Sequence, residues 1–559
     1  MSAKTMLASL CIIATNVFAQ PSSPSVQRSE PFPEPTSGAN RLLFMPDGHT
    51  LFFRFTPRQG IEVTVYNPNH QVSATTRSSI RSWNNRRMYT SQLRGLYAIN
   101  GQAVVFLEQH IHLKPALYRL IFDAHSGALL SDTLIARLSR PRMINHPIST
   151  NPEETPAFVI KKDPDSDFYG IAMTNMRTRN AAKRIRTLHF SPHHTLLNDA
   201  FFEVPDNHLK HIDLADMHVN ADSAVFLATF AYNNGLFYTR NSRIIIGKLK
   251  PGYQSFQTAV LEHTANMQVQ NAALQYNHQD GHIYLLTTVQ SRTTEEKAIM
   301  RTNLINRFAL LMNVINPDSL TVKNHYFVRH NLLDTYAQQH LRYKYPYYGE
   351  IQDFRLNPDG SVQLLMEETD VTGRTSYDSS RLHHIKTPTT NTITHLGGIG
   401  LVKLDAEGKE LDGYAIAKDQ RAEAFINTFA LNKRNQSGWT FRAADNWMNL
   451  SGFCSYDFFT ADGRDYVIYN DYPSNKENTS EHYRSQKTVS LISRTNTVCA
   501  VYDGHQINKT WLYGEPASGE SRFTQMEMIA RKPDGKSFAT MMIERKEGHK
   551  QAYIVWVTL

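Results

Sequence analysis

Short runs of alternating apolar and polar residues fill the chain from about residue 41 to its end. Eight of these runs follow a tight turn that is rich in Asp, Asn and Gly. Asn or Asp followed by Gly, between alternating apolar runs, is a strong local signal for a β-hairpin, because both turn positions must tolerate positive φ. The turns lie at residues 46–49, 100–101, 163–167, 220–222, 280–281, 358–360, 461–463 and 533–535.

A second turn follows in seven of these eight units, for example at residues 125–127, 316–318 and 503–505. Each unit then holds four short strands, here named a to d. Repeated four-stranded units with little helical periodicity predict an all-β fold, a single β-propeller of about eight blades. Tandem β-sandwiches are the alternative, but they need long Greek-key crossovers.

The end of the repeat leaves the number of blades open. The eighth unit stops at Leu559 and lacks a fourth strand. Seven blades remain the alternative, in which the strand RLLFM from Arg41 completes the last blade and one unit is miscounted.

The longest insertions predict which face of the ring is functional. In an up-and-down blade the a–b and c–d turns share one face, and the b–c and d–a connections share the other. The long insertions belong to the second group, and they span residues 330–350, 369–396, 418–451 and 471–487. Long ordered loops on a rigid scaffold often carry binding or catalysis, so we expect the functional surface there.

Tyrosines concentrate in the first of these insertions, in the run RYKYPYY. Their rings can stack on sugars or peptides while the hydroxyls form hydrogen bonds, although the same residues can simply pack the insertion onto the ring. The candidate contact residues on this face are Arg342, Tyr343, Tyr345, Tyr347, Tyr348, His383, His384, Trp447 and Tyr472.

The N-terminal residues predict export. Residues 1–19 combine Lys4, an apolar run and the ending VFA, which is typical of a cleaved secretory signal, and the run is too short to span a membrane. Residues 20–40 are rich in Pro and Ser and predict an extended linker. The propeller would then occupy residues 41–559, in the periplasm or at the cell surface.

Charge and cysteine content narrow the function only slightly. The chain has 59 Lys and Arg against 51 Asp and Glu, and loss of residues 1–19 would leave a net charge of +7. Basic residues gather in one hairpin of the third unit, but aromatic residues are scarce there, so we expect no nucleic-acid partner. These bases are Arg177, Arg179, Lys183, Arg184 and Arg186. Cys454 and Cys499 could form a disulfide or remain two buried thiols.

Motifs for known catalytic or metal chemistry are missing. The chain has no G-x-S-x-G, Walker or H-E-x-x-H motif. The acids at 163–167 alternate as in a calcium loop, but Phe168 stands where a Gly is required, which favours a plain turn. The pair His383-His384 lacks a further ligand at fixed spacing, which disfavours a metal. We therefore assign no catalytic residue, metal or cofactor.

Carboxylates keep one catalytic alternative open. Glu367, Glu368 and Asp370 close a b strand at the insertion face, and Asp353 lies in the innermost strand of the same unit. Paired carboxylates can cleave glycosidic bonds, although solvated acids at the end of a strand are the more ordinary interpretation.

The sixth and seventh units carry a resemblance. Their segments NPDGSVQLLMEE, IGLVKLDAEGKELDGYAIAKDQ and DYVIYNDYPSN resemble a group of uncharacterised exported β-propeller-like proteins of Gram-negative bacteria, over about residues 350–515. This resemblance implies export and a propeller, and it transfers no catalytic residue. The insertion differs from that group, with His383-His384, Gly397-Gly398 and fewer tyrosines.

These observations predict an exported binding or scaffold propeller that engages a protein or glycan partner through the insertion-bearing face. The alternative is a glycan-active hydrolase or lyase with its site near the central channel. A flat aromatic surface favours binding, whereas a polar funnel of converging Asp, Glu, His and Arg favours catalysis.

Overall fold

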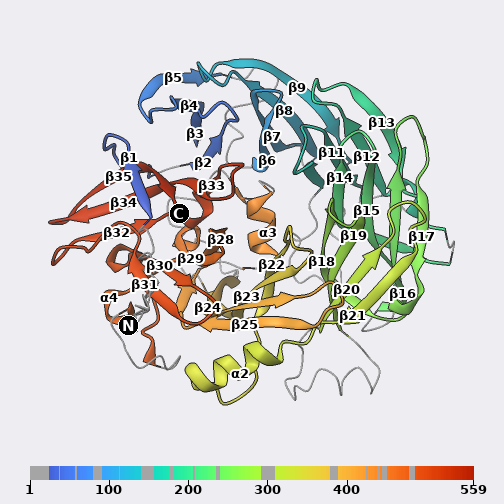
Figure 1. The fold of residues 1–559 in the computed structure, drawn as a ribbon. Helices are drawn as coiled ribbons and strands as arrows, with labels where there is room; N and C mark the ends of the chain where they lie inside the picture. Colours follow the sequence, from blue (N-terminus) through green and yellow to red (C-terminus); the bar gives the residue numbers. More distant parts are fainter. Residues whose placement is uncertain are drawn as a thin grey trace, which may run out of the picture.

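The computed structural model describes most of the chain. The described residues are 24–36, 38–56, 59–79, 91–112, 114–139, 157–175, 178, 180–205, 208–234, 239–290, 309–377, 388–423, 426, 428–436, 441–442, 450–476 and 485–559. Within them, eight antiparallel sheets stand around a ring, which confirms the all-β propeller and its count of eight blades (Figure 1). The predicted signal, residues 1–19, lies outside the described residues.

The first four blades follow the predicted order of strands. Glycines at the a–b turns have positive φ, 95° at Gly48 and 71° at Gly101, as hairpin turns of this kind require. The strands are β2 (Ala39–Phe44), β3 (Thr50–Thr56), β4 (Gly60–Tyr66) and β5 (Val72–Ser78) in blade 1; β6 (Gln92–Ile99), β7 (Gln102–Ile111), β8 (Lys114–Phe122) and β9 (Leu129–Arg137) in blade 2; β10 (Phe158–Lys162), β11 (Tyr169–Thr174), β12 (Ile185–Phe190) and β13 (Leu196–Phe201) in blade 3; and β14 (His211–Asn220), β15 (Ala224–Asn234), β16 (Thr239–Leu249) and β17 (Gln257–Leu261) in blade 4.

The last four blades contain the longest strands and the short additional ones. Their strands are β18 (Gln268–Asn277), β19 (His282–Gln290), β20 (Ala309–Ile315) and β21 (Val322–Phe327) in blade 5; β22 (Glu350–Leu356), β23 (Val362–Tyr377), β24 (Pro388–Leu404), β25 (Glu410–Ile416) and β26 (Gln420–Ala422) in blade 6; β28 (Tyr456–Ala461), β29 (Arg464–Asp471), β30 (Asn496–Tyr502) and β31 (Ile507–Trp511) in blade 7; and β32 (Ser521–Thr524), β33 (Ala530–Arg531), β34 (Ser537–Lys546) and β35 (His549–Thr558) in blade 8. The remaining strand, β27 (Phe441–Arg442), pairs with β6.

The N-terminal strand β1 (Ser25–Arg28) closes the ring by pairing with β35, and it supplies the fourth strand of blade 8. The sequence indicated a linker at this point and considered RLLFM as the closing strand. RLLFM instead belongs mostly to β2, the innermost strand of blade 1. A Pro- and Ser-rich segment buries little surface of its own, but an extended chain can still add main-chain hydrogen bonds to a sheet edge, and β1 is largely exposed.

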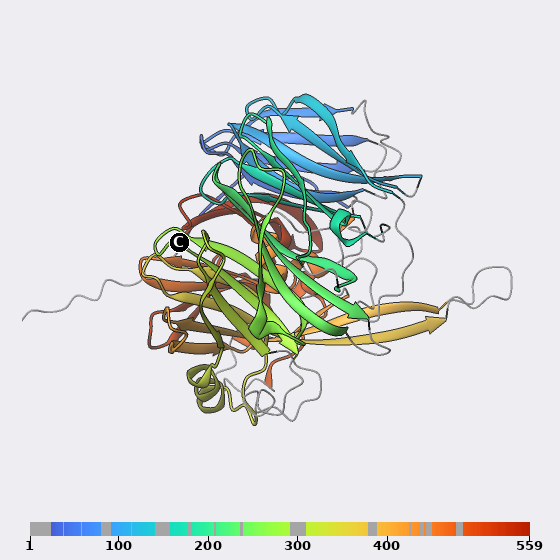
Figure 2. The same ribbon diagram turned by 90° about the vertical axis from the view of Figure 1, so that its right-hand side faces the viewer.

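In the described part of the chain, helices lie only in the connections between strands. The α-helices are α2 (Asn331–His340), α3 (Ala430–Asn435) and α4 (Pro473–Lys476), and the 3₁₀ turns are Ala181–Lys183, Glu262–Thr264, Leu450–Phe453, Ile492–Arg494 and Met526–Met528. No helix in the described part of the chain is long and apolar enough to cross a membrane. The β23–β24 hairpin projects well beyond the ring (Figure 2).

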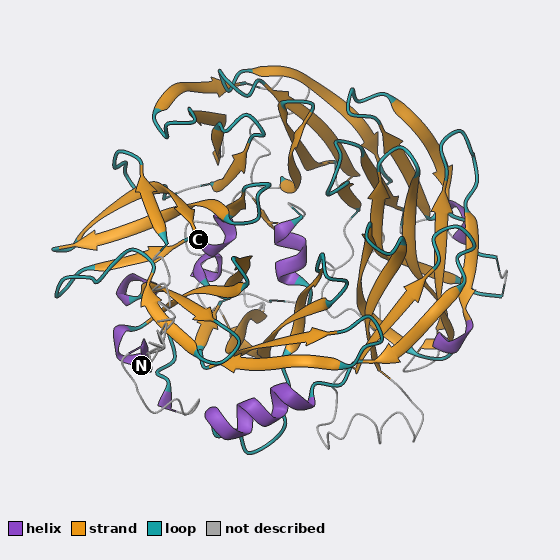
Figure 3. Cartoon of the chain, viewed as in Figure 1, coloured by secondary structure: helices purple, strands orange, loops and turns teal. Residues whose placement is uncertain are grey.

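Helix α3 occupies the centre of the ring, where Figure 3 shows it surrounded by strands. It belongs to the insertion of residues 418–451, which was expected to extend over the surface. Phe429, Ala430 and Leu431 are buried at the start of this helix, and they anchor it against the propeller. The insertion therefore fills part of the central channel.

The core lies between neighbouring blades, where apolar side chains of adjoining sheets pack together. At the junction of blades 8 and 1, the Trp556 indole stacks on His70 at 4.0 Å and its Nε1 donates a hydrogen bond to Thr50 Oγ1 at 3.0 Å. Cys454 and Cys499 are both buried and free, so the alternative of two thiols holds in the structure.

Candidate functional site

Two of the predicted contact tyrosines hold the first insertion on blade 6. Tyr343 and Tyr347 are only 6% and 2% exposed. The Tyr343 hydroxyl donates to Glu368 Oε2 at 2.9 Å, and the Tyr347 hydroxyl donates to the carbonyl of Gly398 at 2.8 Å. A Cβ added to Gly398 would lie 2.5 Å from the Tyr343 hydroxyl, so the glycine makes room for this packing. Both tyrosines therefore pack the insertion onto the ring, which was the alternative to a contact role.

Other members of the predicted set have different surroundings. Tyr345 is 59% exposed, Arg342 is exposed and Tyr348 is partly buried. The Tyr472 hydroxyl accepts hydrogen bonds from the backbone N–H groups of residues 490 and 491, which fixes the neighbouring loop. His383, His384 and Trp447 lie outside the described residues. A binding role for this face stays a prediction.

The carboxylates considered for catalysis are engaged inside blade 6. Glu367 and Lys418 are both fully buried and form an ion pair of 2.7 Å, and Ser455 Oγ also donates to Glu367 at 2.7 Å. Glu368 is buried beneath Tyr343, whereas Asp370 is exposed. These contacts give Glu367 and Glu368 structural roles.

The basic hairpin of blade 3 is partly neutralised. Arg186 donates two hydrogen bonds to the carboxylate of Asp199, and Arg184 is buried and donates to the carbonyl of Thr178 at 3.2 Å. Arg177 and Arg179 lie outside the described residues. Two of the three described bases, Arg184 and Arg186, are therefore engaged within the protein, and Lys183 is exposed.

At the centre of the ring, polar side chains of α3 bind the innermost strands. Asn432 and Asn435 donate to the two carboxylate oxygens of Asp353 at 2.8 and 2.9 Å. Arg434 lies 3.3 Å from Asp457, which Arg531 of β33 also contacts. Burial lowers the pKa of Arg531 to about 9. This network joins α3 to blades 6, 7 and 8.

A central cavity of about 660 Å³ lies against α3, at the end of the ring that carries the a–b turns. Its wall is formed by the innermost strands of blades 1 to 6 together with their turns. Seven carboxamide side chains line it: Gln275, Asn277, Gln279, Asn357, Asn432, Asn435 and Gln436. The insertions leave the ring at the opposite end, so the cavity and the predicted contact loop occupy different faces.

The cations in the cavity wall are paired. Lys161 Nζ lies 3.1 Å from Asp216, Lys162 Nζ lies 3.2 Å from Asp167, and Arg355 Nε lies 3.7 Å from Asp353. The fourth cation, Arg531, is bound to Asp457. Each cation thus has its own carboxylate, and the wall presents mainly amides, aromatic rings and aliphatic side chains to a ligand.

Sequence reasoning missed this cavity because its residues come from seven different blades and from α3. One signal pointed to part of it, since the turn at 163–167 was notable for its acids. The amides show no spacing that predicts a common site, and no helix was predicted within the insertion of residues 418–451.

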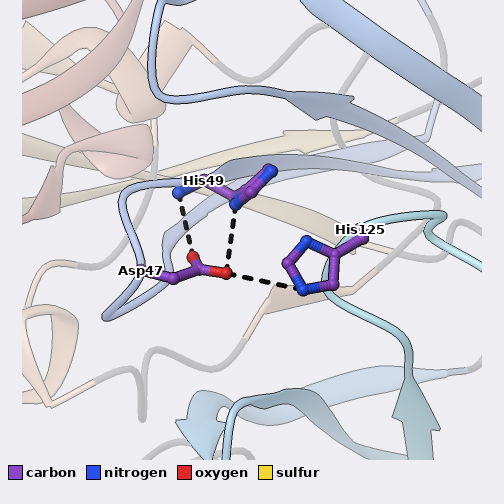
Figure 4. Close-up of side chains that lie close together, drawn as sticks. All are labelled: Asp47, His49 and His125. Carbon is purple, nitrogen blue, oxygen red and sulfur yellow. Dashed lines mark hydrogen bonds and ion pairs between the residues drawn. The ribbon is translucent and has the colours of Figure 1, made fainter.

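A cluster of one carboxylate and two imidazoles lies on the turn face, outside the cavity (Figure 4). Asp47 accepts a hydrogen bond from the backbone N–H of His49, and its Oδ2 lies 3.1 Å from His49 Nδ1 and 3.7 Å from His125 Nε2. His125 belongs to blade 2, so the cluster joins the turns of two neighbouring blades. Asp47 and His125 are exposed.

Asp471, the last residue of the Tyr-Asn-Asp phrase in β29, gives the fold a pH dependence. Burial raises its pKa from 3.8 to about 6, so the folded state favours the protonated acid. We expect the contribution of Asp471 to the free energy of unfolding to be largest below pH 4 and to fall by about 2–3 kcal/mol as the pH rises to 6. In Asp471→Asn, the amide oxygen can still accept from Tyr472 N and Asn475 Nδ2, which both bind Oδ1.

The measurement is urea unfolding of the native chain and Asp471→Asn at pH 4, 5, 6 and 7. As pH rises, the free energy of unfolding of the variant should increase relative to that of the native chain. All other titrating groups are the same in both proteins, so their contributions cancel in this difference. A constant difference across this range would show that Asp471 does not titrate as described.

No protein-family model and no curated protein matches this chain. Among solved structures, the polysaccharide lyase Uly1 matches with a TM-score of 0.36 and 10% identity, over 83% of this chain and 90% of its own. The phage phi92 endosialidase has a TM-score of 0.31 and 10% identity, over 89% and 72%. A post-proline cleaving enzyme from Rickettsia typhi has a TM-score of 0.36 and 10% identity, over 90% and 57%. Likeness at this level assigns neither a family nor an activity.

Proposed function

We propose that this protein is an exported propeller that binds a neutral carbohydrate in its central cavity. The observation that carries the proposal is the cavity of about 660 Å³ with seven carboxamides in its wall. This volume falls within the range of about 300–1,000 Å³ that is usual for small-molecule sites. Carboxamides both donate and accept hydrogen bonds, which suits the hydroxyl groups of a sugar.

The electrostatics of the wall favour a neutral ligand over an anionic one. Because each cation there is held by a carboxylate, an anionic ligand would have to compete with an existing pair. Tyr276 also lines the cavity, and its partly buried ring offers a flat apolar surface beside the amides. Aromatic rings with nearby polar groups suit the two-sided character of sugar rings.

Binding is favoured over catalysis by the state of the central acids. Asp353 accepts hydrogen bonds on both carboxylate oxygens from α3, and Asp457 is held by Arg531. A general acid or nucleophile must instead reach the scissile bond. The glycan-active hydrolase or lyase of the alternative remains an outcome of the experiment below, and export rests on the predicted signal at residues 1–19.

A second candidate is a protein-binding role for the insertion face. The outer part of the β23–β24 hairpin pairs residues 369–377 with 388–396, and it extends past the other strands of blade 6 (Figure 2). Tyr345 and Val371 are exposed on this side, at 59% and 43%. Exposed strands and aromatic residues are common in recognition surfaces.

The experiment is an oligosaccharide array that contains neutral and acidic glycans, probed with the mature protein and three variants. Ala98→Trp fills the cavity wall and should reduce binding to the selected glycan at least about tenfold. Tyr276→Ala should weaken it as well, while Tyr345→Ala on the opposite face should bind like the native protein.

Three outcomes would overturn the proposal. Ala98→Trp could bind as tightly as the native protein, Tyr345→Ala could lose binding, or the native protein could select only acidic glycans. Shortening of the bound oligosaccharide during incubation, abolished by Ala98→Trp, would establish the catalytic alternative in the same cavity.

A further inference from the structure

Two acids and a histidine meet in the wall of the same cavity, next to Tyr276. Asp163 and Asp165 belong to the a–b turn of blade 3, and His278 belongs to the a–b turn of blade 5. One ligand atom from each lies within 4.8 Å of the others. Asp165 Oδ2 is 2.9 Å from His278 Nε2, so the turns of two blades already touch at this point.

A buried histidine of the blade between them provides an independent observation. His218 of β14 lines the same cavity and is only 6% exposed. Its Nε2 is buried, and among the described residues it has no hydrogen-bond partner. Its charged neighbours are Asp163, Lys161 and His278. An orphaned nitrogen in a buried site is costly, so it calls for a ligand that accepts its lone pair.

We propose that Asp163, Asp165 and His278 bind a divalent transition-metal ion beside the unpaired Nε2 of His218, and that Zn²⁺ fits this donor set best. Carboxylate oxygen and imidazole nitrogen are both zinc ligands, and three protein ligands with one further ligand, such as a water, are enough for a tetrahedral site. Two carboxylates neutralise a divalent ion. Calcium suits the set less well, because it requires six to eight oxygen ligands.

The local electrostatics agree with a metal at this point. Lys161 is the nearby cation, and its Nζ is already 3.1 Å from Asp216 and also contacts Gln436. The ion would tie blades 3 and 5 together.

The surface cluster of Asp47, His49 and His125 provides a matched control. It offers one carboxylate and two imidazoles, so it has a single negative charge to set against a divalent ion. His125→Ala therefore removes an imidazole from a similar cluster without touching the cavity.

The experiment is titration of the metal-free mature protein with Zn²⁺ alone, followed by calorimetry. The native protein and His125→Ala should bind one ion at the cavity with equal affinity. The Zn²⁺ affinity of His278→Ala should be at least about 100-fold lower, because loss of a residue that only supports a metal ligand already lowers affinity by about 10–100-fold. His278 is exposed, so this variant should fold, and Asp165→Asn is a second variant with the same expected direction.

Cobalt substitution adds a spectroscopic readout. Co²⁺ in the native protein should give the visible absorption of a four-coordinate site, and His218→Ala should change that spectrum. Unaltered Zn²⁺ binding in His278→Ala and Asp165→Asn, or loss of binding in His125→Ala, would refute the proposed site. Because the probe is the metal alone, a negative result here is distinct from failure of carbohydrate binding.

Discussion

Replacement of Lys418 by methionine is expected to lower the free energy of unfolding by about 3–5 kcal/mol, which is the usual cost of breaking a buried ion pair on one side. The Lys418 ammonium and the Glu367 carboxylate are fully buried and 2.7 Å apart. Lys418 Nζ also donates to the carbonyl of Leu396 at 3.1 Å. Without the lysine, Glu367 would keep its charge in the interior of blade 6, and Ser455 Oγ would be its one remaining side-chain donor among the described residues.

The measurement is the urea midpoint of Lys418→Met, with Glu367→Gln/Lys418→Met as its partner. The double variant should recover much of the loss, because the uncompensated charge is gone. Lys536→Met is the matched control, since Lys536 pairs with Asp462 at the surface and should change the midpoint little. Equal midpoints for Lys418→Met and Lys536→Met would contradict this account of the pair.

The second large effect is expected at Asp457, which joins α3 to the ring. Asp457 is fully buried, and it faces Arg434 of α3 at 3.3 Å and Arg531 of blade 8. Asp457→Ala leaves two guanidinium groups in the interior without their carboxylate, at a cost of about 3–5 kcal/mol. Arg434 would keep its bond to the carbonyl of Tyr456, at 2.5 Å, as its remaining tie to blade 7.

Loosening of α3 distinguishes this effect from a general loss of stability. In Asp457→Ala, hydrogen exchange at residues 430–436 should speed up more than exchange in β14 or β18, which lie in other blades. Asp462→Ala, at the surface of the same blade, should leave both rates unchanged. A uniform increase over the whole ring would show that Asp457 supports the fold without specifically anchoring the helix.

The propeller could be predicted from the sequence because the residues that specify each hairpin lie close together along the chain. Each a–b turn places Asp, Asn or Gly where the chain must reverse, and the strands on both sides follow within a few residues. The closing strand β1 was harder, since Ser25–Arg28 is short and mostly exposed and becomes a strand only through β35, at the other end of the chain. Pairing between the two ends has no local signal.

The central cavity lies at the other end of the ring from the predicted contact face, and it was not predicted for a related reason. Length alone suggested that the insertions form the functional surface, but the longest of them sends α3 into the channel, and the first buries Tyr343 and Tyr347. His218 and His278 meet the turn at 163–167 only because blades 3, 4 and 5 are neighbours in the ring. Contacts between blades depend on the closed ring, which the pattern within one blade does not specify.

The most direct test of the carbohydrate proposal is hydrogen exchange of the mature protein with and without the oligosaccharide selected on the array. Binding in the central cavity predicts slower exchange at residues 275–279, 353–358 and 430–436, with residues 342–348 and 369–377 unchanged. Protection confined to 342–348 and 369–377 would place the ligand on the insertion face and contradict the central claim.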